Sequence, residues 1–429
     1  MKRRDFLASV LALAVTAGEA QAANKQRAKK AGTSAGSDKK NKNKTTASKS
    51  SSRKTSTRRD KRTSRAVAPA SASVSGDQSV IDHPVQGTSA SRLPAVKALE
   101  IPNEWRTCEI VTLVKLPAGT QGPAKLWLPL PMNQDSLYQR VLSHTWQGNT
   151  LSAGMRRLPD GDLEILTCEW RDATDASFRL VSQVATADRQ FDVSRRSAAP
   201  DRDDILRKNL QSSSLIPAEG LVQQLADRIV GRIKDPVAQV KAIYDWVIDN
   251  SVYDPGLPGC GSGDVNKQLS SGRYGGRSAD INGLFVALCR GSGIPARCSY
   301  GLRTGPSSLF PSLGLTGEDA TQAFHVRAEF YIPGYGWVGV DPSDVRRAIT
   351  LDNLSEHEPR LASLRRVLFG VWEMNWVALN TGNDVRIPSL SESPAFIFEP
   401  RLYIDGKKLG PQRTLAAPYY RISARPIRA

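Results

Sequence analysis

The sequence predicts an α+β fold, preceded by a β-sandwich domain and a disordered basic N-terminal segment. Residues 105–196 alternate between apolar and polar side chains, which is typical of half-buried strands. After residue 217 the apolar spacing becomes helical, and strand-like runs return later. No Phe, Trp or Tyr lies between Phe6 and Trp105, so that stretch has too few large apolar groups to order its backbone.

The first 22 residues have the composition of an export signal. A charged start, KRRDFL, is followed by an Ala/Leu/Val run and by the small-residue cleavage site Ala20-Gln21-Ala22. The pair Arg3-Arg4 resembles a twin-arginine signal, although its flanking residues depart from that pattern and leave the general secretory route open. We therefore expect residues 1–22 to direct the chain to the periplasm or cell envelope.

The basic charge of the chain is concentrated at one end. The whole chain carries a net charge of +17, of which residues 1–95 supply +14. Residues 23–95 mix Lys and Arg with Ser, Thr and Ala, without aromatic groups that stack on bases or the period of a membrane-surface helix. Behind an export signal we expect no nucleic-acid partner. This disordered basic linker either binds anionic envelope polymers or is a solvated spacer.

The folded part divides where the pattern changes. Strand-like runs predict a small antiparallel sandwich, assigned to residues 96–200, and the charged run RRSAAPDRDD marks its end. A mixed helical and strand core follows over residues 201–365. Residues 366–429 are expected to be a C-terminal β extension that packs on the core and contains an RLYIDGKKL hairpin. No window after the export signal approaches the about 18 apolar residues of a membrane span, which excludes an integral membrane protein.

Two helices are predicted at the start of the core. Pro217 introduces the first, whose expected inner face is Leu221, Leu225, Ile229 and Ile233. The second has Asp235 as its N-cap and Pro236 in its first turn, with an expected inner face of Val240, Ile243, Tyr244 and Val247. Residues 254–276 are glycine-rich but lack the Gly-Lys-Ser/Thr of a phosphate loop. They lead irregularly into the helical run SADINGLFVALC.

The five cysteines do not form a metal-binding pattern. Cys108 and Cys168 lie in strand-like segments and could pair outside the cytoplasm. Cys289 and Cys298 fit small buried thiols better. No spacing of Cys and His resembles a zinc site, so no metal is expected.

Three motifs between residues 273 and 345 carry a resemblance: GRSADINGLFVALCRGSGIPAR, HVRAE and GYGWVGVDPSD. In this order and spacing they resemble the core of the transglutaminase-like superfamily, which is related to the papain-type thiol enzymes. The resemblance implies a helix packed on an antiparallel sheet, with a nucleophile at the helix start. It also implies acyl transfer or hydrolysis on the amides of peptide or protein substrates, cell-wall peptide among them, and no cofactor.

The resemblance assigns roles to individual residues. Ser278 stands in the position of the family's nucleophilic Cys, His325 matches the base, and Asp341 matches the carboxylate that orients it. Glu329 matches the acidic end of a His-x-Trp-x-Glu pattern in which Arg327 replaces the Trp. A helix N-terminus lowers a pKa by about 1.5 units at most, which leaves an alcohol un-ionised. Ser278 must therefore lose its proton to His325 during attack.

Three interpretations of the site stay open at this point. Ser278 is the nucleophile of a working triad, or the site is inactive and binds peptide or envelope material. The second interpretation is favoured by the position of Ser278 at a helix start with Asp280 in the first turn, because Ser is a common N-cap. Cys260, in the glycine-rich loop 18 residues upstream, is a third candidate, as the nucleophile. The insertion at 304–320 either borders the cleft and shapes specificity or is a disordered loop.

The hairpin after His325 tests the assignment of Asp341. His325, Arg327 and Glu329 share one face of the predicted strand, which would be the polar wall of a cleft. A two-residue turn at Gly334-Tyr335 would put Asp341 on the opposite face. We therefore expect an odd loop or a bulge, for which PGYG supplies the glycines.

Overall fold

The computed structural model describes residues 104–133, 136–158, 161–191, 199–387, 393–409 and 418–427. The expected export signal, residues 1–22, and basic linker, residues 23–95, lie outside this part. Within the described ranges, no helix has both the length and the apolar character that a membrane span requires.

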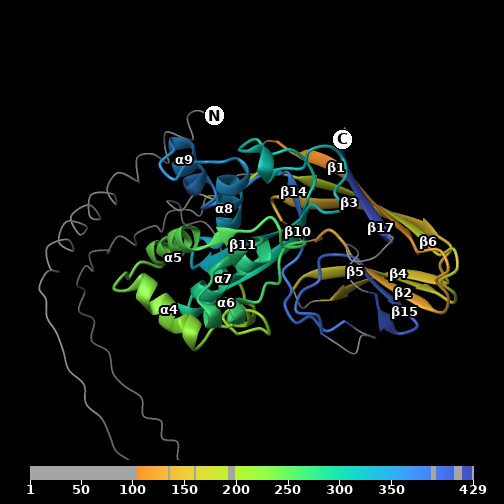
Figure 1. The fold of residues 1–429 in the computed structure, drawn as a ribbon, viewed down its shortest axis with the longest axis horizontal. Coiled ribbons are helices and arrows are strands. Elements are labelled where there is room, and N and C mark those ends of the chain that lie inside the picture. The colour runs from red at the N-terminus through yellow and green to blue at the C-terminus, as the bar shows by residue number, and fades with distance from the viewer. Residues whose placement is uncertain are drawn as a thin grey trace, which may run out of the picture. The chain divides into compact units, whose positions relative to one another are not determined.

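Two antiparallel sheets form the β-sandwich (Figure 1). Their strand orders are β17-β1-β6-β3 and β16-β15-β2-β5-β4. The inner faces of the sheets bury side chains such as Leu126, Leu166 and Cys168 completely. The strands are β1 Arg106–Lys115, β2 Ala124–Pro129, β3 Gln139–Gly148, β4 Ser152–Leu158, β5 Leu163–Trp170, β6 Ser177–Thr186, β15 Arg401–Ile404, β16 Lys407–Lys408 and β17 Tyr420–Pro426.

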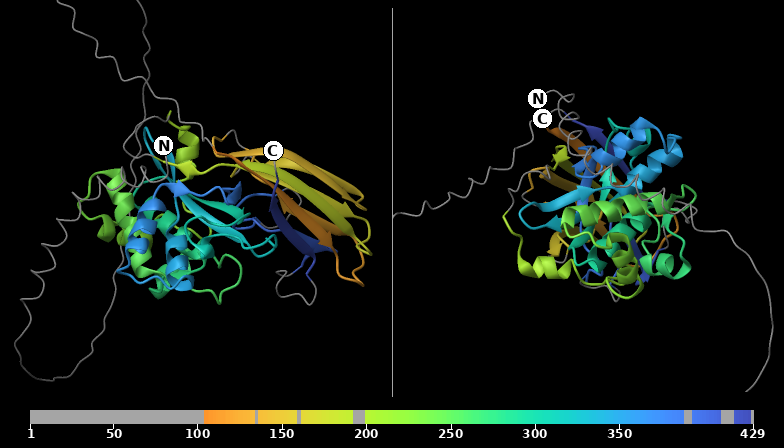
Figure 2. Two further views of the ribbon diagram at one scale, coloured as in Figure 1. Left: turned by 90° about the horizontal axis from the view of Figure 1, so that it is seen from above. Right: turned by 90° about the vertical axis from the view of Figure 1, so that its left-hand side faces the viewer.

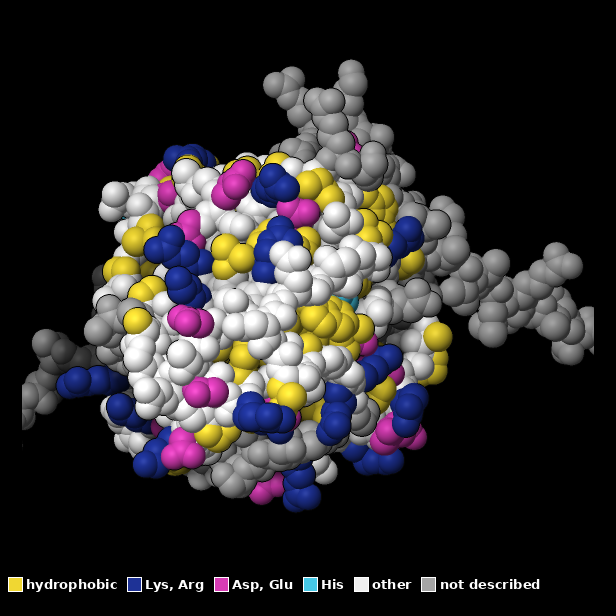
Figure 3. Space-filling view, turned by 90° about the vertical axis from the view of Figure 1, so that its right-hand side faces the viewer, with side chains coloured by type: hydrophobic (Ala, Val, Ile, Leu, Met, Phe, Trp, Pro, Cys, Tyr) yellow, Lys and Arg dark blue, Asp and Glu magenta, His cyan; other side chains and the backbone are white. Residues whose placement is uncertain are grey.

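The edge strands β3 and β4 are among the strands that the sequence pattern does not predict. Each lies at the end of its sheet, so most of its side chains on both faces are exposed and the alternation is weak. Exposed large apolar side chains gather on these strands and their connection, namely Leu142, Trp146, Leu151 and Met155. Figure 3, which views this end of the sandwich, shows hydrophobic groups clustered near the centre of the face.

The C-terminal segment is shared between the sandwich and the core, which corrects the expectation that residues 366–429 pack on the core. Strand β14 (Trp376–Asn380) does join the core sheet. Strands β15 and β17 instead pair with β2 and β1, so the dark blue strand β17 lies beside the orange strand β1 (Figure 2). The reason is that β1 and β2 would otherwise be unpaired edges. The RLYIDGKKL hairpin is confirmed as β15–β16, with positive φ at Asp405 and Gly406.

The core sheet is antiparallel, in the order β12-β11-β10-β14, and helices pack against it (Figure 1). This arrangement confirms the predicted α+β class. The main elements are α4 Leu221–Val230, α5 Pro236–Asn250, α6 Val265–Ser271, α7 Ser278–Gly291, β10 Ala296–Arg303, β11 Phe324–Ile332, β12 Gly336–Val340, α8 Pro342–Leu351 and α9 Pro359–Val367. Shorter pieces are β7 Arg189–Gln190, α3 Asp203–Lys208, β8 Val252–Tyr253, β9 Gly275–Gly276, η1 Pro311–Leu313 and β13 Val371–Trp372.

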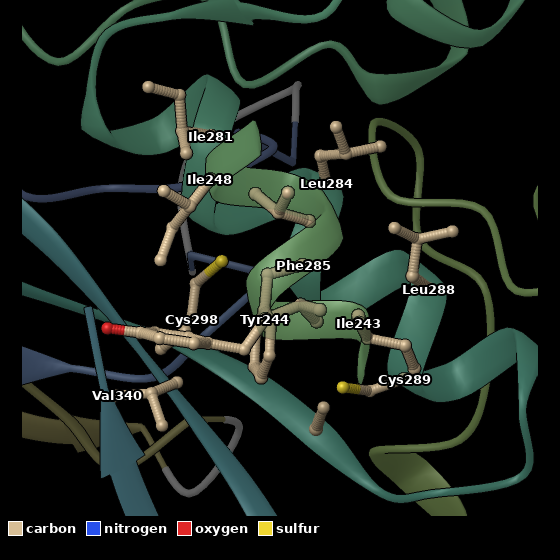
Figure 4. Packing of buried hydrophobic residues seen from close by; sticks show 14 of the residues in the cluster. Ile243, Tyr244, Ile248, Ile281, Leu284, Phe285, Leu288, Cys289, Cys298 and Val340 are labelled. Atoms are coloured by element: carbon tan, nitrogen blue, oxygen red, sulfur yellow. The ribbon is translucent and has the colours of Figure 1, made fainter. Parts of the chain in front are cut away.

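Helix α7 is the centre of the core. It contacts β10 and β11 on one side and α4 and α5 on the other, and its residues from Ser278 to Arg290 are buried. Figure 4 shows Phe285 and Leu288 of α7 packed with Ile243 and Tyr244 of α5. A helix enclosed in this way fixes the position of its first residue relative to the sheet, since well-packed interiors leave little room for movement.

The predicted inner faces of α4 and α5 differ in outcome: all four positions predicted for α5 are buried, whereas the prediction for α4 is only partly right. For α5, the Asp235 N-cap is confirmed, because its carboxylate accepts a hydrogen bond from Ala238 N–H at 2.8 Å. The inner face predicted for α4 is right at Leu225 and wrong at Leu221, which is exposed; the buried residues are Val222, Leu225, Ala226 and Val230. A repeat of four residues drifts by about 40° per step around a helix, whereas alternating steps of three and four stay on one face.

All five cysteines lie in the described part of the chain, and all are buried free thiols. Cys108 and Cys168 therefore do not form the disulfide that their position in strands allowed. Cys289 and Cys298 pack in the hydrophobic core with α7.

Candidate active site

Ser278 is the first helical residue of α7 and not its N-cap, which corrects one basis of the binding-site interpretation. The N-cap is Arg277, whose N–H donates to the Asp280 carboxylate at 2.8 Å. The Ser278 hydroxyl is directed at the sheet instead, where its Oγ accepts the N–H of Val326 at 3.1 Å. The helix thus presents a hydroxyl beside the strand residue that follows His325.

Asp280 anchors the glycine-rich loop to the helix. Its Oδ1 also accepts hydrogen bonds from Gly263 N–H at 2.8 Å and Ser262 Oγ at 3.0 Å. The loop passes so close that a Cβ on Gly261 would lie 1.7 Å from Asp280 Oδ2, and Gly261 has a φ of +93°. The irregular approach predicted here contains the short helix α6, which begins after the N-cap Asp264. Asp280 is therefore a structural residue that holds the entrance to α7.

His325 and Asp341 form a buried hydrogen-bonded pair. The distance from His325 Nε2 to Asp341 Oδ2 is 2.7 Å. Ile332 pairs with Gly336, so the hairpin loop has three residues, and the expected odd loop is confirmed. Val340 pairs with Ala328, so the next residue, Asp341, lies on the opposite face from Ala328, which is the face of His325.

Asp341 is held by its own surroundings. It is the N-cap of α8, and its Oδ1 accepts the N–H of Asp344 at 3.1 Å and the hydroxyl of Ser343 at 2.8 Å. Asn282, one turn after Ser278 on α7, donates to the same oxygen at 3.0 Å. These bonds leave Oδ2 for the imidazole. Sequence reasoning missed Asn282 and Ser343, and their one signal was the spacing of Asn282 four residues after Ser278.

The surroundings of His325 favour a neutral imidazole. Burial lowers its pKa well below the ordinary value, and the charges of Arg303 and Arg327 lower it further, whereas Asp344 opposes them. Because Nε2 faces the Asp341 carboxylate, that nitrogen carries the proton. Nδ1 has no hydrogen-bond partner within the described residues and keeps its lone pair. This is the protonation state of a general base.

A second carboxylate lies beside the pair. Asp344 Oδ1 is 3.5 Å from His325 Nε2 and 2.5 Å from Arg303 Nη2. Sequence reasoning missed both Asp344 and Arg303, and the signal available for the first was the repeated Asp in DPSD. Segment 304–320 borders this side of the site, as expected, because the Leu313 carbonyl accepts a hydrogen bond from Arg303. It is not the disordered loop of the alternative, since it includes the helical turn η1.

Arg327 and Glu329 share the face of His325 but do not line an open cleft, so the predicted polar wall is wrong. All three side chains are buried. Arg327 lies against the rings of Trp372 and Trp376, with its Nε 3.7 Å from Asp341 Oδ2, and burial lowers its pKa to about 10. The two tryptophans therefore cover the face that the sequence left open.

Glu329 belongs to a separate ion-pair cluster. Arg297 Nε lies 2.7 Å from its carboxylate, and Arg189 also binds it. Burial alone would raise the pKa of Glu329, but the two arginines outweigh this effect and hold it at about 2. Its role is to join β11 to β10 and to Arg189 of β7.

Cys260 lies next to Ser278 but is not activated. Its carbonyl accepts the N–H of Ala279 at 2.8 Å. Burial raises the pKa of its thiol to about 12, although a hydrogen bond with the Ser278 side chain opposes this. A thiol with such a pKa is protonated at neutral pH and is a poor nucleophile.

A hollow of about 400 Å³ lies along the chain segment that leads into α7. Its lining includes Tyr253, Tyr274 and the strand β9, which ends two residues before Ser278. Val252 and Leu257 line it with exposed side chains, 61% and 40% accessible. By contrast, Ser278 is 5% and His325 3% accessible, so both side chains lie below the surface.

His325, Asp341 and Asp344 do not form a convincing metal site. Their possible ligand atoms lie within 4.8 Å of one another. However, Arg303 binds the Asp344 carboxylate, and Arg327 lies 3.7 Å from that of Asp341. Two buried guanidinium groups at the ligand oxygens oppose a cation.

Comparisons of the sequence with known proteins identify a family. The sequence profile described as "Transglutaminase-like superfamily" matches residues 223–342. A protein of Haemophilus influenzae, described as uncharacterized, is 33% identical over 286 residues, which are 63% of this chain and 77% of that protein.

Several solved structures match this chain at low sequence identity. One, titled as a proposed cysteine protease from Cytophaga hutchinsonii, is 16% identical and covers 76% of this chain and 92% of its own, with a TM-score of 0.49. The periplasmic domain of TgpA from Pseudomonas aeruginosa is 19% identical and covers 57% and 90%, with a TM-score of 0.29. Red sea bream transglutaminase is 14% identical and covers 58% and 52%, with a TM-score of 0.23.

Proposed function

Because this chain belongs to the transglutaminase-like superfamily, we propose that it is an exported enzyme that performs acyl transfer or hydrolysis on peptide amides through Ser278, His325 and Asp341. The observation that carries the proposal is the buried 2.7 Å contact of His325 with Asp341, beside a helix that begins at Ser278. A neutral imidazole with its proton on Nε2 is the base that an alcohol nucleophile requires, because the alcohol cannot ionise by itself at neutral pH.

In the proposed reaction, Ser278 Oγ attacks the amide carbonyl carbon while its proton passes to Nδ1 of His325. Asp341 keeps the imidazole in the Nε2–H tautomer and stabilises the imidazolium that forms. The imidazolium then gives the proton to the leaving amine as the C–N bond breaks, which leaves an acyl ester on Ser278. Water or a second amine attacks this ester, again with His325 as base, and releases the acyl group.

Backbone N–H groups would stabilise the charges of this reaction. Within the described residues, no hydrogen bond is donated by the N–H of Ser278, so at the positive end of α7 this N–H is available for the carbonyl oxygen. The N–H of Val326 donates to Ser278 Oγ and favours negative charge on that oxygen as it develops. The hollow beside β9 would receive a peptide side chain next to the amide, since Val252 and Leu257 make it apolar.

An inactive fold that binds peptide or envelope material is the second candidate. It is favoured by the low exposure of Ser278, because a substrate carbonyl must reach an oxygen whose residue is 5% accessible. In that case the hollow lined by Val252 and Leu257 would be the binding surface, and Ser278 would serve only to form hydrogen bonds with Val326 N–H and the Cys260 side chain.

The location of the protein is part of the proposal. The signal-like residues 1–22 support export to the periplasm or envelope, by the twin-arginine or the general secretory route. The charge of the N-terminal 95 residues supports contact with anionic envelope polymers, which would place the enzyme near cell-wall peptides.

The test compares wild type with Ser278→Ala and Ser278→Cys on a panel of acetylated peptide amides, with intact mass spectrometry to detect an acyl-enzyme. Turnover that is lost in Ser278→Ala supports the triad, and a thiol introduced at the helix end should react with iodoacetamide faster than any wild-type cysteine. Absence of turnover in all three, with peptide binding retained, supports the second candidate. Activity that survives Ser278→Ala but disappears in Cys260→Ala would replace the proposed nucleophile.

A further inference from the structure

Two carboxylates face the same nitrogen of His325, and the proposed reaction uses one of them. Asp341 accepts the hydrogen bond of Nε2 at 2.7 Å, while Asp344 Oδ1 stands 3.5 Å from that nitrogen. Arg303 takes the same oxygen of Asp344 at 2.5 Å. The side chains of Asp344 and Arg303 are at most 4% exposed, so water screens their charges weakly.

We propose that Arg303 is a positioning residue: it binds Asp344 and thereby leaves Asp341 as the single acceptor of His325. The proposal rests on the function proposed above, since it concerns the base of that reaction. An unpaired Asp344 would add a second negative charge beside Nε2, and opposite charge at this distance favours the protonated form. An imidazolium has no lone pair on Nδ1 and cannot take the proton of Ser278.

The other groups around the imidazole leave the charges of the two carboxylates balanced by two guanidinium groups. From β11, Arg327 places Nε 3.7 Å from Asp341 Oδ2, so each carboxylate has one guanidinium group nearby. From α8, Arg347 is directed to the Tyr253 hydroxyl. From α7, the neighbouring side chain is the uncharged amide of Asn282. After burial, Arg303 makes the largest contribution that lowers the pKa of His325, and Asp344 acts in the opposite direction, which agrees with the proposed roles.

Both the backbone and the side chain of Arg303 are held in place by neighbouring elements. It is the last residue of β10, and its guanidinium also donates to the carbonyl of Leu313 in the segment that follows. Asp344 lies in the first turn of α8, where its N–H donates to Asp341. A planar guanidinium can hold a carbonyl and a carboxylate at once, which a lysine amine does less well.

The test measures the protonation of His325 directly, by ring ¹⁵N spectra of the full-length protein labelled at histidine, with His325→Gln to assign the signals. In wild type we expect the neutral Nε2–H tautomer at pH 7. In Arg303→Met we expect an imidazolium at pH 7, together with turnover reduced about tenfold or more and an acid limb moved to higher pH. In the double variant Arg303→Met/Asp344→Asn, removal of the second charge should restore the neutral ring and most of the turnover.

Arg297→Met is the matched control. It removes another buried arginine of β10 that binds a carboxylate, that of Glu329, but the pair does not contact His325. We expect lower stability and an unchanged tautomer at His325. If Arg303→Met destabilises the protein equally and leaves the ring neutral, the pair is structural and the proposal is wrong.

Two further measurements keep the proposal testable. Removal of one partner of a buried ion pair leaves the other charge unpaired and is strongly destabilising, so Arg303→Met could fail to fold. Arg303→Gln keeps hydrogen-bond donors for Asp344 and Leu313 but lacks the charge. Like Arg303→Met, it should show His325 as an imidazolium at pH 7. A wild-type His325 that is already an imidazolium at pH 7 would overturn the inference without any variant. The spectra need no substrate, so a protein without turnover but with the expected ring states would refute the proposed function and retain the role of Arg303.

Discussion

At the scale of single residues, the site depends on which group each polar atom already binds. Asp341 uses Oδ1 for Asn282, Ser343 and the start of α8, and Oδ2 for His325. Because each oxygen of this carboxylate has its own donors, the group cannot rotate without losing several buried hydrogen bonds. Each such bond contributes about 1 kcal/mol net to stability, and a buried donor left without a partner costs more. The orientation of the imidazole follows from that constraint.

Asp341→Asn tests this orientation with little change in shape. Asn is also a good N-cap, so α8 should persist and the melting temperature should fall by only a few degrees. The amide would donate to Nε2 and move the ring proton to Nδ1, which removes the base. We expect a loss of kcat of about 10⁴-fold, as for the equivalent change in serine proteases. Turnover measured at saturating peptide amide checks this, and a loss below tenfold would contradict the role of Asp341.

At the scale of elements, the start of α7 is positioned by the loop before it. The Asp280 carboxylate accepts hydrogen bonds from the N–H groups of Arg277 and Gly263 and from the hydroxyl of Ser262. The glycine-rich segment is therefore folded around this one carboxylate. Glycines are required there because the backbone comes too close to Asp280 for a side chain. The position of Ser278 at the start of α7 therefore depends on the conformation of this loop.

Gly261→Ala and Gly272→Ala separate contact from backbone strain. Both glycines have positive φ, +93° and +64°, but only the first lies against Asp280, while no atom lies within 4 Å of a Cβ on the second. We expect Gly272→Ala to cost about 1 kcal/mol and Gly261→Ala about 3 kcal/mol or more, because the latter also displaces a buried carboxylate. Urea denaturation gives both values. Equal losses would show that the Asp280 contact is unimportant.

At the scale of the whole folded unit, the first and last strands that the structure describes, β1 and β17, pair with each other. β17 pairs with β1, and Ile422 is buried in the sandwich with residues that come from the core sheet, such as Leu302 and Val377. A sandwich closed by the C-terminal strand should unfold together with the core, since they share one hydrophobic cluster.

Ile422→Ala tests the link between the two halves. Removal of a buried isoleucine side chain costs about 2–5 kcal/mol. We expect one unfolding transition at lower temperature, seen equally by fluorescence and circular dichroism. Arg421→Ala, at the exposed neighbouring position, should change stability by less than about 0.5 kcal/mol. Two separate transitions in Ile422→Ala would mean that the sandwich and the core unfold independently.

The basic linker gives a prediction for the complete chain. If residues 23–95 bind anionic polymers, their deletion should abolish sedimentation with vesicles that contain phosphatidylglycerol. Binding of the full chain should weaken steeply between 50 and about 300 mM salt, because exposed charges are screened. Vesicles of phosphatidylcholine are the control. Binding that is unaffected by deletion or salt would make the linker a spacer.

The sequence by itself determined the elements that have strong local signals. Asp235-Pro236 predicts the start of α5, and PGYG the odd hairpin that brings Asp341 to His325. The ordered motifs predicted the family and the pair His325–Asp341. These features depend on residue spacing along one or two neighbouring elements, and spacing is visible in the sequence.

Only the tertiary structure decided what surrounds these residues. It placed β15 and β17 in the sandwich, because free strand edges find partners regardless of distance along the chain. It covered the face of Arg327 with Trp372 and Trp376 and brought Arg303 to Asp344, which is 41 residues away. Burial and charge compensation arise from all the elements packed around a group, so no local pattern encodes them.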